Sequence, residues 1–415
     1  MTPREERGLI IAAICKLNRT ENGEWLVPSQ SGNERIYRVN LETKKCTCPD
    51  CTEGGFVCKH VYAAEYTHKR EVLPDGTMID TQRLSFTKKT TYKQDWRAYN
   101  LAQSIEKHRF QELLFDLTRG VQEFPTKKTG RPPHTVKDAI FAMTLKVYGT
   151  LSGRRSSCDM KDAFESFHTE RLMPGQKICH FFEDPRYTPI LKSLIAHSAT
   201  PLRAVATKFA IDSSGFGSGT YESWYDAKYG VTRRKCVWVK THICCDVKTN
   251  VVTAVRILDK DAGDSPQFVP LIKETRRSFT VGEVSADKAY ASVENFEAIA
   301  EMGGQAFIAF KSNATGAAGG AFQKAFHYFQ FKADEYMEHY HKRSNVESTF
   351  SAIKRKFGHM VRSKCDFAMV NEVLCKILAH NICVLIQEQC ELGIEPIFWK
   401  KEERQPNDAL PMIPA

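Results

Sequence analysis

The sequence predicts an α/β fold for the C-terminal half of this 415-residue chain, preceded by a helical region and a small cysteine-rich module. Short β-prone apolar runs recur after residue 205 with helical spacing between them, which is typical of α/β folds. The region before them shows apolar residues at helical spacing, and four cysteines fall within thirteen residues near the N-terminus. A chain of this length should form two or three domains. We place them at 1–75, 90–204 and 205–400.

The N-terminal cysteine cluster has the spacing of a structural zinc site. Cys46-x-Cys48 is followed, after nine residues, by Cys58-x-His60, so the segment offers three thiolates and one imidazole. Structural Zn²⁺ takes such a closed tetrahedral set. Cys51 is an additional candidate, because Cys48-x2-Cys51 is itself a zinc spacing, and free cysteines in a loop are the remaining alternative. The pattern resembles the SWIM zinc finger, a module associated with binding nucleic acid or protein, and the sequence does not choose between these partners.

The middle region combines helical patterns with basic charge. Residues 94–122 and 134–149 carry apolar residues at helical spacing, and a chain-breaking run, Gly130-Arg131-Pro132-Pro133, lies between them. Residues 88–156 contain 14 Lys or Arg against six Asp or Glu. We expect this region to bind DNA, with helical packing on the following domain as the alternative. Residues 70–91 show no sustained period and are predicted to form a linker.

Strands and helices alternate after residue 205. The strand-like segments are 206–212, 236–246, 250–258, 281–287 and 305–310, and the segment 265–277 is predicted to be a helix. Asp212 and Asp287 each end one of these strands, and the small residues after Asp212 should leave its carboxylate open. Either aspartate alone could be a helix cap or a turn residue.

A third carboxylate, Glu347, lies in a helical segment with a polar stripe. Tyr340, Arg343, Glu347 and Lys354 are spaced so that, on an α-helix, they fall within an arc of roughly 60°. Residues 340–364 contain seven Lys or Arg and no acidic residue besides Glu347. The alternative is a surface helix with an ordinary i to i+4 ion pair. Two strand-end aspartates followed by a helical glutamate form the arrangement that holds two Mg²⁺ or Mn²⁺ ions for phosphoryl transfer.

These motifs resemble the DDE transposases of prokaryotic insertion sequences, in the branch with a Tyr-x2-Arg-x3-Glu-x6-Lys signature. The resemblance covers residues 205–390 and includes AIDSSGF around Asp212, the strand WVKTH, and SADKAY around Asp287. It implies an RNase H-like core, a mixed five-stranded sheet with helices on both faces, whose acidic residues meet at one edge. The residues that would hold the metal ions are Asp212, Asp287 and Glu347, and those that would contact phosphates near the cleaved strand are Tyr340, Arg343 and Lys354.

Two further side chains are candidates for contact with the scissile phosphate. Strand alternation places Trp238, Lys240 and His242 on one face, from which Lys240 and His242 could approach a phosphate beside Asp212. An exposed sheet face without a role is the alternative. Only 60 residues separate Asp287 from Glu347, so we expect no large β-rich insertion of the kind that some members of the family carry.

Together these patterns predict a DNA transposase that binds the terminal repeats of its element and uses Mg²⁺ (or Mn²⁺) to cleave double-stranded DNA and transfer it to target DNA. We expect a homodimer in the DNA complex. The alternatives are an RNase H-like nuclease without strand transfer and a non-catalytic, zinc-dependent DNA-binding regulator. No signal peptide and no run of about 18 apolar residues is evident, so no membrane association is expected. We expect free cysteines and a cytoplasmic, nucleoid-associated protein.

Overall fold

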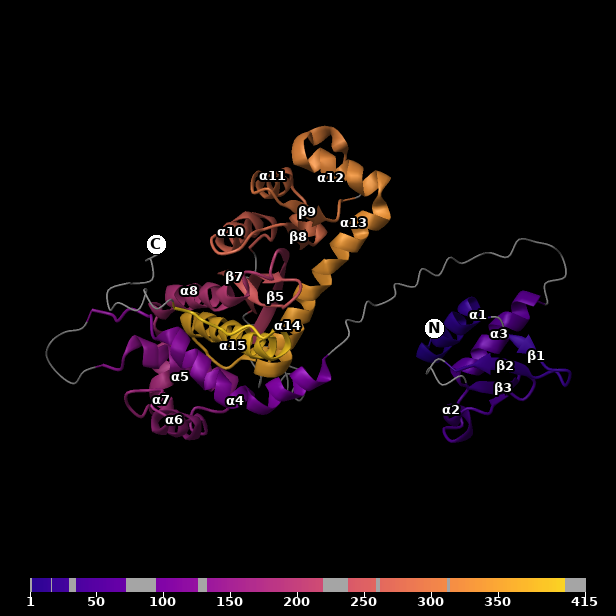
Figure 1. Ribbon diagram of the computed structural model, residues 1–415, viewed down its shortest axis with the longest axis horizontal. Helices are drawn as coiled ribbons and strands as arrows, with labels where there is room; N and C mark the ends of the chain where they lie inside the picture. The colour runs from indigo at the N-terminus through magenta and orange to yellow at the C-terminus, as the bar shows by residue number, and fades with distance from the viewer. Residues whose placement is uncertain are drawn as a thin grey trace, which may run out of the picture. The chain divides into compact units, whose positions relative to one another are not determined.

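The structure of this chain, a computed structural model, consists of two compact units, Met1–Tyr92 and Lys93–Ala415 (Figure 1). The residues that it describes are 2–15, 17–29, 35–71, 95–125, 133–218, 238–258, 262–311 and 314–399. Most of the predicted linker at 70–91, and most of the predicted break at 130–133, lies outside these residues. Each unit is described by itself.

The first unit is a small antiparallel sheet covered by helices. Its strands pair in the order β1 (Asn18–Arg19), β2 (Trp25–Pro28), β3 (Ile36–Asn40) and β4 (Lys45–Cys46). Its helices are α1 (Pro3–Ile14), α2 (Pro49–Thr52) and α3 (Lys59–Glu71). Trp25, Val27 and Val39 form the core under α3. Helix α1 packs closely on α3 because Gly8 has no side chain; a Cβ there would lie 2.5 Å from Cβ of Tyr62.

The second unit is built on a mixed sheet in the order β7-β6-β5-β8-β9. The strands are β5 (Lys208–Ser218), β6 (Trp238–Asp246), β7 (Val252–Leu258), β8 (Glu283–Ala286) and β9 (Gln305–Ile308). Strands β5, β6 and β7 form an antiparallel meander, whereas β8 and β9 run parallel to β5. This topology is RNase H-like and confirms the predicted fold class. A short sixth strand, β10 (Met360–Val361), was not predicted and pairs with the end of β5.

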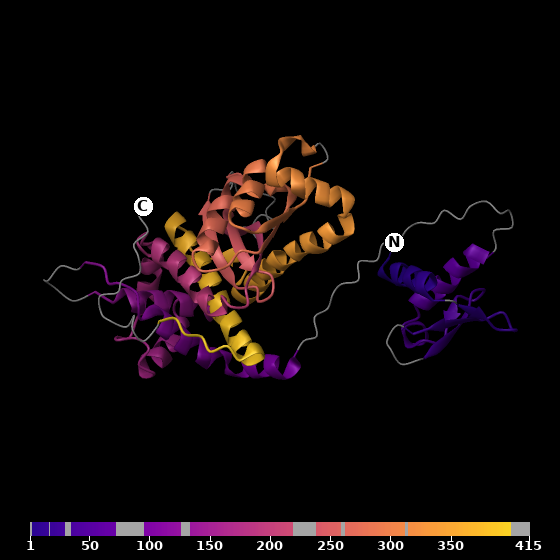
Figure 2. The ribbon, with the colours of Figure 1, turned by 45° about the horizontal axis from the view of Figure 1, so that its top comes forward.

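Helices cover both faces of this sheet (Figure 2). Helix α10 (Ser265–Arg276) packs on β6 and β7, and α14 (Ser344–Phe357) packs on β5 and β6. Helix α11 (Val293–Glu301) packs on β9, after which α12 (Gly320–Phe331) and α13 (Ala333–Tyr340) lead into α14. The described residues between Asp287 and α14 thus form the helices α11, α12 and α13 and the strand β9, and they contain no β-rich insertion.

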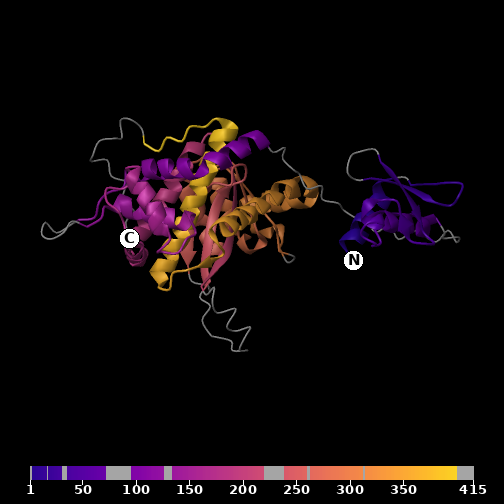
Figure 3. The same ribbon diagram turned by 90° about the horizontal axis from the view of Figure 1, so that it is seen from below.

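Helix α15 (Asp366–Leu392) lies between the sheet and the N-terminal helices of the second unit (Figure 3). It contacts α4 (Trp96–Thr118), α5 (Val136–Tyr148), α7 (Gly175–Glu183) and α8 (Tyr187–Ala199), and α6 (Ser156–Glu165) packs on α5. By length and composition α15 could cross a membrane, but 89% of its most apolar window is buried inside the protein, as expected of a core helix.

The packing of α5 shows which of the two interpretations of the helical region applies to this helix. Ten of its thirteen residues are buried, so α5 has no free face to place in a DNA groove. The helices of this region share one hydrophobic core with the sheet. The alternative of helical packing therefore describes α5, while DNA contacts by the outer surface of the region stay a prediction.

Two local predictions were wrong. Asp212 does not end its strand, because β5 continues to Ser218 and residues 213–217 pair with β6. This pairing outweighs the low β-propensity of serine and glycine. The predicted helix through residues 340–354 is also interrupted, because the 3-10 turn η4 (His341–Arg343) separates α13 from α14.

Candidate functional site

Two aspartates lie side by side on neighbouring parallel strands. Strands β5 and β8 pair with Ile211 opposite Ala286, so the residues that follow, Asp212 and Asp287, lie at one level. Neighbouring strands are about 4.8 Å apart, which brings the two carboxylates within reach of one cation. Each carboxylate also accepts a hydrogen bond from the backbone N–H of the residue after it, at 2.8 and 2.7 Å respectively.

The surroundings of Asp212 disfavour the ionised form of its carboxylate when no cation is bound. Burial raises its pKa, and the carboxylates of Asp287 and Glu347 raise the pKa further, while Arg343 opposes them. Acidic groups that are held together against their mutual repulsion are typical of functional cation sites. A divalent cation would offset both burial and repulsion, and carboxylate oxygens are the donors that Mg²⁺ prefers. These residues therefore fit such an ion.

Glu347 approaches from the first turn of α14, where Arg343 holds it. Nη1 of Arg343 lies 2.7 Å from Oε1 of Glu347 and 3.5 Å from Oδ2 of Asp212, so the guanidinium bridges two of the three carboxylates. The Glu347 side chain is 54% exposed. Among the residues that the structure describes, the three carboxylates do not converge closely enough to share one ion. To hold a metal ion together with the two aspartates, Glu347 would have to release Arg343.

A cleft of about 620 Å³ opens along β5 and α14, lined in part by Asp212, Glu347 and Lys354. Nζ of Lys354 donates a hydrogen bond of 2.6 Å to Oγ of Ser214 and lies 5.3 Å from the centre of the Phe216 ring. Burial lowers the pKa of Lys354. Since Ser214 is two residues beyond Asp212, this cation is fixed about 7 Å along the strand from the carboxylates.

The turn that carries Arg343 is attached to the sheet by Glu283, which the sequence interpretation did not single out. Oε2 of Glu283 accepts hydrogen bonds from Nδ1 of His339 at 2.9 Å and Nζ of Lys342 at 2.8 Å. Burial by itself would raise the pKa of Glu283, but the hydrogen bonds from its cationic neighbours, Lys342 first, lower it to about 2. Tyr340 is the last residue of α13, directly before this turn, and its ring centre lies 5.9 Å from the guanidinium of Arg343.

Lys240 and His242 do not reach the cleft. His242 pairs with Ser213, whose side chain points away from that of Asp212, so both basic residues lie on the opposite face of the sheet. His242 is fully buried, and burial lowers its pKa to about 4. Nζ of Lys240 lies 2.8 Å from Oδ1 of Asp264. The prediction that Lys240 and His242 approach a phosphate beside Asp212 is therefore wrong. The alternative of an exposed sheet face is also wrong for His242, because this residue is buried.

Asp264 is the acidic residue that sequence reasoning missed. Besides pairing with Lys240, it accepts a hydrogen bond of 3.1 Å from Oγ of Ser213. Burial works to raise its pKa, but Lys240 and Ser213 together lower it. Asp264 thus holds β5 at Ser213, the residue after Asp212, from the opposite face of the sheet. The sequence offered one indication of a role for Asp264. It directly precedes the predicted helix at 265–277, and aspartate is common at the start of a helix.

The first unit brings together the four predicted zinc ligands. The thiols of Cys46, Cys48 and Cys58 and a ring nitrogen of His60 are buried and lie within 4.8 Å of one another. Nδ1 of His60 is 3.8 Å from Sγ of Cys46 and 3.7 Å from Sγ of Cys58. With Zn–S bonds of about 2.3 Å, a tetrahedron has edges of about 3.8 Å. Cys51 lies outside the set, and its Sγ accepts the backbone N–H of Cys46 at 3.3 Å.

Comparison with known families agrees with both sites. Residues 203–382 match the transposase DDE domain, and residues 37–69 match the SWIM zinc finger. The former works with a divalent ion such as Mg²⁺ or Mn²⁺, and the latter holds Zn²⁺. Among solved structures, the piggyBac transposase synaptic complex with hairpin DNA matches at 12% identity and a TM-score of 0.32, over 74% of this chain and 86% of that chain. A TM-score of this size does not establish a shared fold.

Proposed function

We propose that this DNA transposase, which carries a transposase DDE domain and a SWIM zinc finger, cleaves DNA at the ends of its own element and joins the freed ends to target DNA. The observation that supports this best is the position of Asp212 and Asp287 directly after the paired residues Ile211 and Ala286 of two parallel strands. Asp212 lines a cleft together with Glu347 and Lys354. The site thus combines oxygen donors for metal ions with a fixed cation for a phosphate.

Asp212, Asp287 and Glu347 would hold two Mg²⁺ or Mn²⁺ ions. When bound, such ions activate water and stabilise the leaving oxygen of an in-line phosphoryl displacement. The sheet positions the two aspartates, and α14 brings the glutamate. With Glu347 bound to metal, the guanidinium of Arg343 would be free to bind a phosphate with two parallel hydrogen bonds. Lys354 supplies a point charge on the other side of Glu347, and Tyr340 supports Arg343.

Two displacements at phosphorus account for the reaction. In the first, water loses a proton as its oxygen bonds to the phosphorus at the element end, and the 3′ oxygen of the element leaves and takes up a proton. In the second, that 3′-hydroxyl attacks a phosphodiester of the target, loses its proton, and displaces a 3′ oxygen of the target strand. Each step exchanges one P–O bond for another, so neither a covalent enzyme intermediate nor a nucleophilic side chain is needed.

Recognition of the element is assigned to the parts outside the carboxylate site. We expect the zinc module and the outer surface of the helical region to hold the terminal repeats, since residues 88–156 carry a surplus of basic residues. Joining two ends calls for two active sites, so we expect a homodimer in the DNA complex. The expected location is the cytoplasm, in association with the nucleoid.

The test is incubation of the full-length protein with DNA that carries the inverted repeats flanking its gene, in the presence of Mg²⁺, with cleavage mapped on both strands. Wild-type protein should cut at the repeat ends and yield strand-transfer products. Asp287→Asn should bind the DNA but cut at least a hundredfold more slowly, by analogy with the loss of other groups that stabilise transition-state charge (about 10²–10³). Glu301→Gln, at an exposed position on α11, is the matched control. Cleavage without joined product would favour a nuclease, and cleavage by Asp287→Asn at the wild-type rate would remove this residue from the site.

A further inference from the structure

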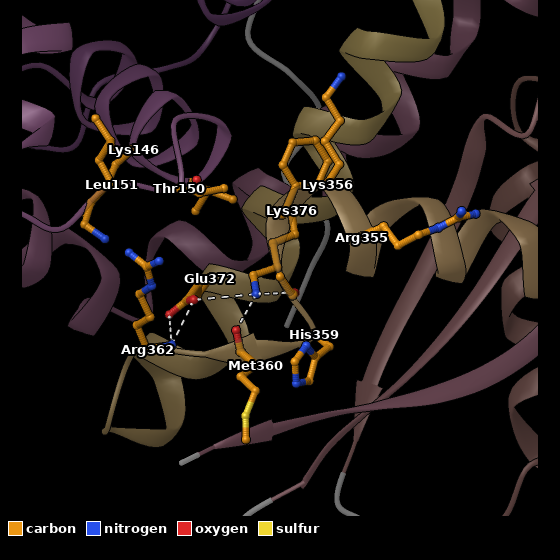
Figure 4. Close-up of a pocket in the computed structure, with 13 residues that line it drawn as sticks. Lys146, Thr150, Leu151, Arg355, Lys356, His359, Met360, Arg362, Glu372 and Lys376 are labelled. Atoms are coloured by element: carbon orange, nitrogen blue, oxygen red, sulfur yellow. Dashed lines mark hydrogen bonds and ion pairs between the residues drawn. The ribbon is translucent and has the colours of Figure 1, made fainter. Parts of the chain in front are cut away.

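A second pocket, of about 310 Å³, opens beside the carboxylate cleft and shares Arg355, Gly358 and His359 with it (Figure 4). It lies between the end of α5, the end of α14 and the first half of α15. No step of the proposed reaction uses it. Because the two hollows share lining residues, a polyanion that enters the cleft can continue into this pocket.

The pocket is strongly basic. Its lining includes five Lys or Arg side chains and one carboxylate, that of Glu372. Figure 4 shows the ends of the Lys146 and Arg362 side chains directed toward one another, although they arise from different parts of the chain. Among the described residues, neither forms an ion pair with a carboxylate, whereas Lys356 pairs with Glu106. Two cations that face each other without an acidic partner are typical of an anion site.

The loop that carries Arg362 is held in place by a buried ion pair. Nζ of Lys376 donates hydrogen bonds to the carbonyl oxygens of Gly358 and Met360, at 2.9 and 2.7 Å. The Glu372 carboxylate accepts the backbone N–H of Arg362 at 3.0 Å. Both oxygens of the single carboxylate are therefore engaged by the backbone of the loop and do not neutralise the Arg362 side chain. The backbone that carries Arg362 is therefore set in advance of binding, which reduces the entropy that a ligand must remove.

We propose that this pocket binds a backbone phosphate of the same DNA whose scissile bond lies at Asp212, several nucleotides away from that bond. The inference rests on the proposed function for the position of the scissile bond, but not for the charge of the pocket. Along α14, Arg355 and Gly358 lie about 12 and 16 Å beyond Glu347, at about 1.5 Å per residue. One strand of DNA advances about 3.4 Å per nucleotide, so the contact falls roughly four or five nucleotides from the cut.

Neutral methylphosphonate linkages, placed one at a time along a terminal duplex, locate this contact. Full-length wild-type protein should bind the duplex less tightly when the neutral linkage lies roughly four or five nucleotides from the mapped cleavage site. Arg362→Gln and Lys146→Gln should each become insensitive to that linkage. Wild-type affinity should fall between about 50 and 200 mM salt, and in each variant this fall should be about 3.5-fold smaller. A factor of about 3.5 is what one phosphate contact contributes over this range of salt. Lys273→Gln, which removes an exposed lysine from α10, should match wild type.

The outcomes separate this inference from the proposed function. If the wild-type protein binds but does not cleave the duplex, the proposed function fails, while the salt dependence of Arg362→Gln still tests the pocket. If the protein cleaves, and both pocket variants keep the wild-type salt dependence and methylphosphonate pattern, the pocket is not a DNA site. An equal change in Lys273→Gln would show an effect of net charge and would also overturn the inference.

Discussion

Replacing Lys376 with Met should destabilise the second unit, because the change leaves Glu372 buried without its cation. Lys376 is 1% exposed and Glu372 is 6% exposed, and their charged groups are 3.8 Å apart. The variant also loses the two hydrogen bonds from Lys376 to the loop after α14. Methionine is similar in length and fills most of the same volume, so the change tests charge and hydrogen bonding rather than packing.

The magnitude follows from burial and from the size of the unit. Removing one partner of a buried ion pair costs about 3–5 kcal/mol. The second unit has roughly 270 described residues, which corresponds to an unfolding entropy of about 0.6 kcal/mol/K. The Tm of this unit should therefore fall by about 5–9 °C. In the double variant Lys376→Met/Glu372→Gln, no buried charge is unpaired and the new amide still accepts hydrogen bonds from the loop, so part of the loss should be recovered.

The assay is thermal unfolding of the full-length protein at neutral pH, followed by near-UV circular dichroism in the presence of Zn²⁺. Lys161→Met, at an exposed site on α6, is the matched control and should shift the Tm by less than about 1 °C. An unchanged Tm for Lys376→Met would refute the reasoning. A double variant that is less stable than the single one would also refute it, because the loss would then not come from an unpaired charge.

Three further predictions concern the zinc module and the turn before α14. Cys58→Ser should abolish binding of one Zn²⁺ per chain, whereas Cys51→Ser should not, as measured by metal analysis of the purified protein; equal losses would make Cys51 a ligand. Arg343→Ala should flatten the slope of log affinity against log salt by about one unit on a terminal duplex, and Glu347→Gln should not; an unchanged slope for Arg343→Ala would leave Arg343 as an ordinary ion pair. Because the pKa of Glu283 is lowered to about 2 in the folded state, its stabilising effect should be complete above roughly pH 4.5 and lost as the pH falls toward 2. The difference in Tm between wild type and Glu283→Gln should shrink over that range, and a constant difference would exclude this linkage.

Short-range patterns in the sequence were sufficient for much of the fold and for the zinc site. The two ligands of Cys46-x-Cys48, and those of Cys58-x-His60, are only two positions apart in the sequence. The backbone therefore keeps the members of each pair close together, and the spacing alone indicates paired ligands. The five strands were recognised because apolar runs with turn residues between them reflect burial on the sheet. The order of Asp212, Asp287 and Glu347 along the chain pointed to a metal site without any knowledge of distances.

The tertiary structure alone decided which side chains face one another. Pairing of His242 with Ser213 turns that histidine to the opposite face from Asp212, and a shift of one residue would have reversed the result. The bridge from Arg343 to Asp212 joins residues that lie far apart in the chain. The ion pair of Lys376 with Glu372 has an ordinary i to i+4 spacing, which in sequence is indistinguishable from a solvated pair. The packing of α15 inside the second unit buries this ion pair. Because removing the two charges from water is costly, loss of either partner destabilises the fold, which is not so for a pair on the surface.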